Sequence, residues 1–464
     1  MQLDDTIVAI ATPPGRGGLG VVRLSGSKAC DIARPMLRLA HGHDLEAGHV
    51  HFGELIEPAT GQRLDEVVVT FFAKPHSYTT DDVVEISCHG SPVVLRQVVQ
   101  TAVTGGARLA EPGEFTMRAF LNGRIDLTQA EAVRDLIESQ TLYQAQVAAR
   151  QLEGALSRRL RPTKQKLVEL VATLEAGVDF AEDDVAVMPD WQILSRIAEV
   201  RASLAELLAS FAYGKVVHEG LTLAIVGRPN VGKSSLFNRL VERERAIVTA
   251  TPGTTRDLVS ETVSIGGIPV RLVDTAGIRT AFDEAESIGV RKSMEALADA
   301  NIVLVVLDVS EFGSDDFTPD WELLEQTQGR PRIVVCNKTD LLKADRGAIA
   351  RKLPVEEQAS AVVFTSAVSG EGIEELRGMV LDEVHGDAST EQESGLLTNL
   401  RQQKLVEDAL AALDRAARAV PLRTPHEMVL LDLYSALRPL DDITGATTAD
   451  DILSLIFSSF CIGK

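Results

Sequence analysis

Short apolar runs separated by turn residues fill the first quarter of the chain. The runs DTIVAIAT, GLGVVRLSG, HVHFGELIE, DEVVVTFF and DVVEISCHG have the length and β-branched composition of strands, and Gly or Pro separates them. Two helix-like segments, SKACDIARPML and PVVLRQVVQTAV, interrupt the series. We therefore predict an α+β domain over residues 1–118.

Apolar residues at three- and four-residue spacing predict helices on both sides of a central region. This pattern begins at Leu127 and continues through TQAEAVRDLIESQTLYQAQVAARQLEGALSRRL, and it resumes in RQQKLVEDALAALDRAARAV and HEMVLLDLYSALRPLDDITG. Residues 383–395 (EVHGDASTEQESG) have the polar composition of a linker. We expect residues 119–216 and 383–464 to pack as one discontinuous helical domain.

The central region, residues 217–382, combines apolar strand-like runs with helical segments. LVSETVSI and IPVRLVD are separated by Gly266-Gly267, the two-residue connection of a hairpin. LTLAIV, IVLVVLD and RIVVCN read as buried strands. The expected fold class is therefore multidomain, with an α/β domain inserted into the helical one.

Composition narrows the classes of protein. The 464 residues carry a net charge of −21, which argues against a protein that coats nucleic acid with its whole surface. The four cysteines are scattered without a CxxC pair, which favours reduced thiols. The N-terminus lacks the features of a signal peptide, and no apolar run has the length of a membrane span. A cytoplasmic protein is the expected result.

The segment Gly227-Arg-Pro-Asn-Val-Gly-Lys-Ser-Ser235 lies between a predicted strand and a predicted helix and matches a phosphate-binding loop. Its glycines let backbone N–H groups surround phosphate oxygens, Lys233 can reach the β- and γ-phosphates, and Ser234 can bind Mg²⁺. A glycine-rich turn without a ligand is the alternative for this motif taken alone.

Three further motifs follow in the order found in GTPases. Asp274-Thr-Ala-Gly277 ends a strand, where an acidic residue can hold hydrated Mg²⁺ and Gly277 can meet a γ-phosphate. In Asn337-Lys-Thr-Asp340, the carboxylate can accept two hydrogen bonds from guanine, a pattern that adenine does not offer. The backbone of Ser366-Ala367 can meet guanine O6. The base is therefore predicted to be guanine.

The segment between the phosphate loop and Asp274 supplies a further predicted metal ligand. Thr255, in TPGTTRD, is the candidate that completes the Mg²⁺ shell when γ-phosphate is present. Ile278 occupies the position at which Ras-like enzymes carry a water-orienting Gln, and its side chain forms no hydrogen bonds. Hydrolysis must therefore be arranged differently. The predicted GTP contacts are Asn230, Val231, Gly232, Lys233, Ser234, Ser235, Thr249, Thr254, Thr255, Asp274, Thr275, Ala276, Gly277, Asn337, Lys338, Asp340, Ser366 and Ala367.

The motifs GRPNVGKSS, TPGTTRD, DTAGIR and NKTD, with TIVAIATPPGRGGLGVVRLSG, PGEFTMRAFLNGRIDLTQAEA and the terminal CIGK, closely resemble the MnmE (TrmE) family of bacterial tRNA-modification GTPases. The resemblance covers the whole chain. It implies a homodimer whose N-terminal domains pair and bind 5-formyl- or 5,10-methylene-tetrahydrofolate. It also implies that the GTPase domains approach each other when GTP binds.

The resemblance implies that K⁺ beside the phosphates replaces the arginine finger of other GTPases. Asn230 would bind this ion, together with oxygens of Thr249, Thr251 and Thr254. A cation in this place would stabilise charge that develops in the transition state. An amide that only stabilises the loop is the alternative role for Asn230.

The resemblance also assigns residues beyond the DTAG motif. Glu286 would polarise the attacking water, and Arg279 would support the switch region, so both join Lys233 as predicted catalytic residues. An ordinary acidic residue near a helix start is the alternative for Glu286.

For the folate site, the resemblance carries over Arg23, Glu85, Arg124 and Lys464. A carboxylate can accept from the amide and amino groups of a pterin, and cations suit the carboxylates of folate. The family often has Lys where this chain has Arg124, which leaves the contact geometry open. Cys461 could act as a nucleophile or as a buried structural cysteine, and both possibilities stay open.

The implied function is GTP hydrolysis that serves modification of the wobble uridine of tRNA at C5. The flavin-dependent partner MnmG (GidA) would act with it and supply FAD, and folate would donate the one-carbon unit. The alternative is a regulatory or ribosome-assembly GTPase that binds RNA without changing it covalently.

Several features receive a simpler interpretation. The basic stretch Arg158–Lys166 could contact tRNA phosphates, but a solvated helix face is favoured. His76, Cys88 and His89 lack metal-ligand spacing and are assigned no metal. The loop ATPPGRGGLG lacks the Lys-Ser/Thr end of a phosphate loop and is expected to be a tight connection between strands.

Overall fold

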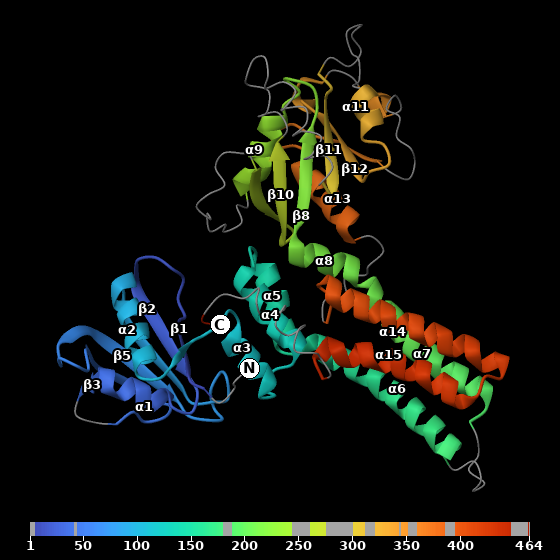
Figure 1. Cartoon of the computed structure of the whole chain (residues 1–464). Helices are drawn as coiled ribbons and strands as arrows, with labels where there is room; N and C mark the ends of the chain where they lie inside the picture. Colours follow the sequence, from blue (N-terminus) through green and yellow to red (C-terminus); the bar gives the residue numbers. More distant parts are fainter. Residues whose placement is uncertain are drawn as a thin grey trace, which may run out of the picture. The chain divides into compact units, whose positions relative to one another are not determined.

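The computed structural model (Figure 1) divides the chain into two compact units. The first unit comprises Met1–Arg134, Gln151–Leu160 and Tyr434–Lys464, and the second comprises Asp135–Arg150 and Arg161–Leu433. The structure describes residues 5–40, 44–179, 188–243, 260–274, 300–310, 321–342, 345–350, 360–385, 395–446 and 463. Among these residues, no helix has both the length and the apolar character needed to cross a membrane.

The described part of the first unit is built on a seven-stranded sheet in the order β3-β4-β5-β6-β2-β1-β7. Its strands are β1 (Ile7–Ile10), β2 (Gly17–Ser25), β3 (Leu37–Leu39), β4 (Val50–Ile56), β5 (Arg63–Phe72), β6 (Val83–Gly90) and β7 (Arg108–Leu109). Its helices include α1 (Ala29–Ala33), α2 (Pro92–Thr104) and α3 (Glu114–Leu121). The predicted α+β class is confirmed.

Alternation along the strands gives this sheet two different faces. Val84, Ile86 and Cys88 of β6 point into a core that α1 and α2 cover. Glu85 lies between them in sequence and therefore belongs to the opposite face. β1 and β2 pair as antiparallel strands on either side of residues 11–16, so the loop there is a connection between strands, as predicted.

The second unit contains a six-stranded sheet in the order β13-β12-β11-β8-β10-β9. Its strands are β8 (Leu221–Val226), β9 (Ser260–Ile265), β10 (Ile268–Asp274), β11 (Ile302–Asp308), β12 (Arg332–Asn337) and β13 (Ser360–Phe364). The helices beside it are α9 (Lys233–Arg243), α11 (Trp321–Gln326), α12 (Arg346–Ala350) and α13 (Ile373–His385). All neighbouring strands are parallel except β9 and β10, which form the predicted hairpin.

The inner strands are continuous apolar runs. Helices cover both faces of this sheet, so side chains on both sides of these strands are buried. Leu304 and Val306 of β11 pack in the same core as α9 and α13, whereas Val303 and Val305 pack in the core of α11 and α12. Figure 1 shows α9 and α11 on opposite sides of the strands. α13 continues to His385, so the predicted linker begins three residues too early, because residues 383–385 (EVH) contain no helix-breaking residue.

The helical segments form where the apolar spacing predicts them. They are α4 (Leu127–Glu138), α5 (Leu142–Leu152), α6 (Ala155–Asp179), α7 (Asp190–Ala209), α8 (Phe211–Glu219), α14 (Leu400–Ala419) and α15 (His426–Thr444). α14 begins after Asn399, whose side chain accepts a hydrogen bond from the N–H of Gln402. α7 packs along α14 in the second unit, where Arg201 and Asp414 form an ion pair of 2.7 Å. The unit boundaries fall within α4, α5, α6 and α15.

Within the second unit, the turn between β9 and β10 packs against α5. Gly266 and Gly267 have φ angles of 58° and 84°, the left-handed values that a two-residue hairpin turn requires. The Thr141 hydroxyl donates a hydrogen bond of 2.5 Å to the Gly267 carbonyl oxygen. A Cβ atom on Gly267 would lie 2.6 Å from the Cβ of Tyr143. Gly267 thus permits both the turn and its contact with α5.

We predict that Gly267→Ala destabilises the α/β domain more than a matched glycine replacement does. Gly329→Ala is the control, because Gly329 has a φ of 77° in the same domain but no atom within 4 Å of the added Cβ. The control should cost about 1 kcal/mol of backbone strain, and Gly267→Ala should cost about 1–3 kcal/mol more from overpacking. Urea unfolding of both variants measures the difference, and equal losses would show that Tyr143 does not restrict the turn.

Candidate functional site

The phosphate loop joins the buried end of β8 to the start of α9. A Cβ atom on Gly227 would lie 2.5 Å from the Val306 carbonyl oxygen, so only glycine fits where the loop crosses β11. Asn230 has a φ of 65°, a left-handed conformation that Asn adopts more readily than most residues. The Lys233 ammonium group donates to the carbonyl oxygens of Gly227 at 2.8 Å and Arg228 at 2.7 Å. The loop therefore curves around the Lys233 side chain, as the motif predicts.

Asn337 connects this loop to the predicted base-recognition motifs. Its side chain is buried at the end of β12, and its Nδ2 donates to the Val231 carbonyl oxygen at 2.9 Å. Its Oδ1 accepts from the Ala367 N–H at 3.2 Å and from the Thr365 hydroxyl at 3.3 Å. Gly232 lies so close that an added Cβ would be 2.3 Å from Nδ2. One amide thus holds the phosphate loop and the Ser366-Ala367 loop together.

Asp340 and Lys338 are fixed by separate partners. The Ser366 hydroxyl donates to Asp340 Oδ1 at 2.6 Å, which joins two segments predicted to face guanine. Lys338 has a φ of 67°, and its ammonium group lies 2.5 Å from Asp308 Oδ2. Burial opposes ionisation of Asp308, but hydrogen bonds from Lys338 and Ser310 outweigh it and lower the pKa of Asp308. Asp308 therefore stays charged and holds Lys338 at the edge of the sheet.

Two residues near this site were not singled out in the sequence. Asp308 ends β11, and the carboxyl ends of parallel strands are where α/β sheets bind ligands, so its position was a usable signal. Arg239 lies in the middle of α9, and its guanidinium group donates to the carbonyl oxygens of Ala367 and Val368. An arginine on the polar side of an amphipathic helix gives no such signal in the sequence.

In the first unit, strand register places Arg23 directly opposite Glu85. Both lie on the sheet face away from α1 and α2, and Arg23 Nη2 lies 2.7 Å from Glu85 Oε1. The Arg23 guanidinium is 5.6 Å from the Phe115 ring centroid and 5.7 Å from that of Tyr78. Its Nη1 donates to the Gly463 carbonyl oxygen at 3.3 Å, which brings the penultimate residue to this pair.

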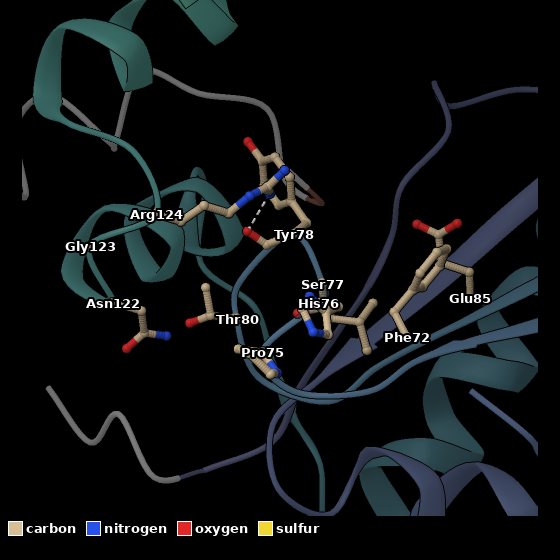
Figure 2. Close-up of a pocket in the computed structure, with 11 residues that line it drawn as sticks. Phe72, Pro75, His76, Ser77, Tyr78, Thr80, Glu85, Asn122, Gly123 and Arg124 are labelled. Atoms are coloured by element: carbon tan, nitrogen blue, oxygen red, sulfur yellow. Dashed lines mark hydrogen bonds between the residues drawn. The ribbon is translucent and has the colours of Figure 1, made fainter. Parts of the chain in front are cut away.

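A pocket of about 570 Å³ opens beside this ion pair. Figure 2 shows Arg124 reaching over Tyr78, with Glu85 and Phe72 on the other side. Arg124 Nη1 donates to the Tyr78 carbonyl oxygen at 2.6 Å, and its guanidinium lies 5.0 Å from the Tyr78 ring centroid. The pocket is lined by Phe72, Pro75, His76, Ser77, Tyr78, Thr80, Val83, Glu85, Asn122, Gly123 and Arg124.

Glu85 and Arg124, both predicted from the sequence, therefore line the same pocket, and Arg23 pairs with Glu85. Tyr78 and Asn122 were missed. The loop AKPHSYTT, which carries Tyr78, shows only turn residues and one aromatic residue in the sequence. The separation of 46 residues between Tyr78 and Arg124 hides their contact.

A buried ionic cluster fixes α3, which leads into the pocket. Arg118 is 1% exposed and donates to the backbone oxygen and a carboxylate oxygen of Asp5. Arg108 and Arg118 both donate to Glu114 Oε1, at 2.6 Å and 3.0 Å. Burial alone would raise the pKa of Glu114, but hydrogen bonds from Arg108 and Arg118 outweigh it, and the pKa is lowered. The turn after α3 then positions Arg124.

Cys88 and His89, to which the sequence analysis assigned no metal, each have a protein environment that the structure describes. Cys88 lies in the core under α1 and α2, where burial raises its pKa to about 11. His89 Nδ1 lies 2.6 Å from Asp65 Oδ1 at the exposed end of β6.

Several predicted residues lie outside the described residues, and their roles stay predictions. Asp274 is the last residue of β10, on the expected edge of the sheet, but its side chain is not described. The predicted residues outside the described ranges are Thr249, Thr251, Thr254, Thr255, Thr275, Ala276, Gly277, Arg279, Glu286, Cys461 and Lys464.

A phosphate loop between a parallel strand and a helix, joined through Asn337 to a guanine-type Asn-Lys-x-Asp motif, defines the class of P-loop GTPases. Two family models then match the chain: the MnmE helical domain over residues 127–461 and the GTP-binding protein TrmE N-terminus over residues 6–124. The chain therefore belongs to the MnmE family of tRNA modification GTPases, and the resemblance seen in the sequence is confirmed.

Relatives named tRNA modification GTPase MnmE match from end to end. The protein from Koribacter versatilis is 67% identical over 466 residues, and that from Moorella thermoacetica is 44% identical over 470 residues, with 100% of both chains covered in each case. Among solved structures, an Aquifex aeolicus Era variant is 26% identical and covers 41% of this chain and 66% of its own, with a TM-score of 0.28.

We predict that Glu114→Gln destabilises the first unit in a pH-dependent way. Glu114 has a lowered pKa in the folded state, so it contributes stability above the ordinary carboxyl pKa of about 4 and loses that contribution as pH falls. The variant should therefore lose about 3–5 kcal/mol near neutral pH, and the gap to the unmutated protein should narrow at about pH 3.5.

Chemical unfolding at both pH values, followed by hydrogen exchange in β1 and α3, measures the effect. Glu66→Gln is the control, because Glu66 is 51% exposed and pairs with the surface residue Arg63. It should change stability by less than about 1 kcal/mol at either pH. A gap for Glu114→Gln that stays constant with pH would contradict a role for its charge.

Proposed function

We propose that this GTPase uses GTP hydrolysis to drive modification of the wobble uridine (U34) of tRNA at C5, by a carboxymethylaminomethyl or aminomethyl group. Two observations support the proposal. The guanine-nucleotide site lies in a chain that matches the TrmE N-terminus and the MnmE helical domain. The region matched to the TrmE N-terminus carries a separate pocket that unites cationic, acidic and aromatic side chains.

GTP binds with its phosphates in the loop before α9 and its base at Asp340, Ser366 and Ala367. Lys233 neutralises the β- and γ-phosphates, and the buried position of its stem makes the ammonium group point into the loop. Mg²⁺ is proposed to bind the hydroxyl group of Ser234, an exposed residue at the start of α9, with Thr255 and Asp274 as further contributors. A Mg²⁺ ion held by these residues would neutralise part of the phosphate charge.

K⁺ is proposed to bind at Asn230 and at oxygens of Thr249, Thr251 and Thr254. Asn230 is exposed in the loop, and a side-chain amide oxygen is a group that can bind a cation. Its φ of 65° is a second reason for Asn at this position, because the side chain also helps the backbone adopt a left-handed conformation. These two roles make different experimental predictions.

Glu286 is proposed to orient the attacking water, with Arg279 as a supporting switch residue. The proposal rests on family membership and on Ile278, which has no side-chain group for that task. A carboxylate can accept a proton or polarise a bridging water, so it replaces the glutamine of Ras-like enzymes chemically.

The pocket beside Glu85 is proposed to bind 5-formyl- or 5,10-methylene-tetrahydrofolate, which supplies a one-carbon unit. Its residues fit this ligand: Glu85 can accept from the pterin, the Tyr78 ring offers an apolar face, and Arg124 can bind a folate carboxylate. Arg23 pairs with Glu85 at 2.7 Å and so orients its carboxylate group. Lys464 follows Gly463, whose carbonyl oxygen already accepts from Arg23, so Lys464 is proposed as a further contact.

The proposed working form is a cytoplasmic homodimer that acts on tRNA with MnmG (GidA), which brings FAD. The charge of −21 supports the view that the partner carries much of the tRNA affinity. The proposal includes the domain organisation predicted from the sequence. Residues 1–118 would bind folate and form the dimer, residues 217–382 would bind GTP, and residues 119–216 and 383–464 would form the helical domain.

We predict that a strain without this chain lacks the C5 modification of wobble uridine. Mass spectrometry of tRNA nucleosides should show loss of the modified uridine, and expression of the intact chain should restore it. Expression of the Lys233→Ala variant in the deletion strain tests whether the modification requires nucleotide binding. Unchanged nucleosides in the deletion strain would instead support a regulatory or ribosome-assembly GTPase.

We predict that the unmutated chain hydrolyses GTP at least about tenfold faster in K⁺ than in Na⁺. Asn230→Gly should lose this stimulation by K⁺. Glycine accepts the left-handed φ of 65° without strain, so this change removes the amide oxygen and leaves the backbone free to keep its conformation. Phosphate release in the two salts, with mant-GDP binding as a control for occupancy, measures the effect. Full K⁺ stimulation in Asn230→Gly would assign Asn230 a purely conformational role.

A further inference from the structure

Arg239 forms a bridge between the helix that follows the phosphate loop and the loop that follows β13. Its Nε donates to the Ala367 carbonyl oxygen at 3.1 Å, and its Nη2 donates to the Val368 carbonyl oxygen at 2.5 Å. Its Nη1 lies 3.2 Å from Glu242 Oε2, one turn further along α9. The planar guanidinium group thus holds two consecutive peptide carbonyl groups at once.

Ala367 packs against the core of the sheet, but the rest of the loop that Arg239 holds has little apolar packing. Val368 is 77% exposed, and Gly370 has a φ of 85°. Its shape depends on polar contacts, such as the Ser369 N–H to the Ser366 hydroxyl at 3.1 Å and the Gly370 N–H to the Ser366 carbonyl oxygen at 2.8 Å. A segment held by hydrogen bonds rather than by a core moves when one of them is removed.

Ala367 is therefore restrained on both sides. Its N–H donates to Asn337 Oδ1 at 3.2 Å, and its carbonyl oxygen accepts from Arg239. Because Arg239 fixes the peptide group after Ala367 and Asn337 contacts the one before it, the orientation of the Ala367 N–H is determined by the two together.

We propose that Arg239 is a positioning residue for recognition of guanine O6. The inference rests on the proposed function, in which the Ser366-Ala367 backbone meets O6. Because O6 only accepts, it would share the Ala367 N–H with Asn337 Oδ1 in a three-centre hydrogen bond. Arg239 lies on the far side of these peptide groups and acts through them, without contacting the nucleotide. Lys could reach one carbonyl oxygen but lacks the fork that holds both.

The same contact links recognition of the base to binding of the phosphates. Lys233 and Arg239 lie on one helix, about 9 Å apart along its axis at 1.5 Å per residue. Asn337 makes the second connection between the two regions, through Val231. A shift of α9 when phosphate binds would therefore be carried to the base loop by a rigid element.

The test compares Arg239→Gln with the unmutated full-length chain in equilibrium binding of three diphosphates. GDP and IDP both carry O6, so their affinity should fall by the same factor, roughly tenfold for one misplaced hydrogen bond. The 5′-diphosphate of 2-aminopurine riboside lacks O6, so its affinity should stay within about twofold. In steady-state hydrolysis, KM for GTP should rise while kcat stays the same.

Three further variants keep the result interpretable. Glu242→Gln removes only the carboxylate on Nη1 and should leave all affinities within about twofold. Arg239→Lys keeps the charge and the aliphatic stem and should give an intermediate loss for GDP and IDP, and it replaces Arg239→Gln if that variant fails to fold. Asp340→Asn should weaken GDP more than IDP, because guanine carries the exocyclic amine and hypoxanthine does not.

Equal weakening of all three diphosphates would assign Arg239 a general structural role and overturn the inference, and so would unchanged affinity for GDP. Failure of the unmutated chain to prefer GDP over the 2-aminopurine analogue would instead overturn the proposed contact with O6. The two failures are therefore distinguishable.

Discussion

One buried amide, the Asn337 side chain, is the constraint on which the nucleotide site depends. It binds the Val231 carbonyl oxygen on one side and the Ala367 N–H on the other, so the phosphate loop and the base loop share a single partner. With 1% exposure, the amide has no access to water, and any loop movement that broke these bonds would leave a buried polar group unpaired. The lack of a side chain at Gly232 follows from this constraint, because the amide occupies the space that a Cβ would need.

The N-terminal pocket combines one face of the sheet with the loop that joins β5 to β6 and the turn that follows α3. Period-two alternation puts the apolar residues of β6 under α1 and α2 and leaves Glu85 on the other face, where strand register supplies Arg23 as its partner. The cluster around Glu114 then anchors α3, so that Arg124 reaches Tyr78 at the rim of the pocket. Two sites with different ligand chemistry thus use the same principle: regular secondary structure fixes the backbone, and a few paired charges fix the side chains that bind.

The candidate sites could be predicted from the sequence only where a local motif carries the chemistry. The phosphate loop, Asn337 and Asp340 follow from short patterns, because backbone geometry within a few residues decides what they bind. Arg239 and Tyr78 were missed for the opposite reason. Each acts through a partner distant in sequence, such as the 128 residues that separate Arg239 from Ala367, and no local spacing encodes such a contact.

The sequence by itself determined the elements, the fold class, the hairpin at Gly266-Gly267 and the family, since all of these depend on hydrophobic period, turn residues and contiguous motifs. It also indicated that Arg23, Glu85 and Arg124 serve one ligand, but only through resemblance. The tertiary structure decided how those side chains pair, which peptide groups Arg239 holds and where helix α13 ends. The physical reason is that strand register and side-chain packing depend on all neighbours in space, whereas periodicity depends only on neighbours along the chain.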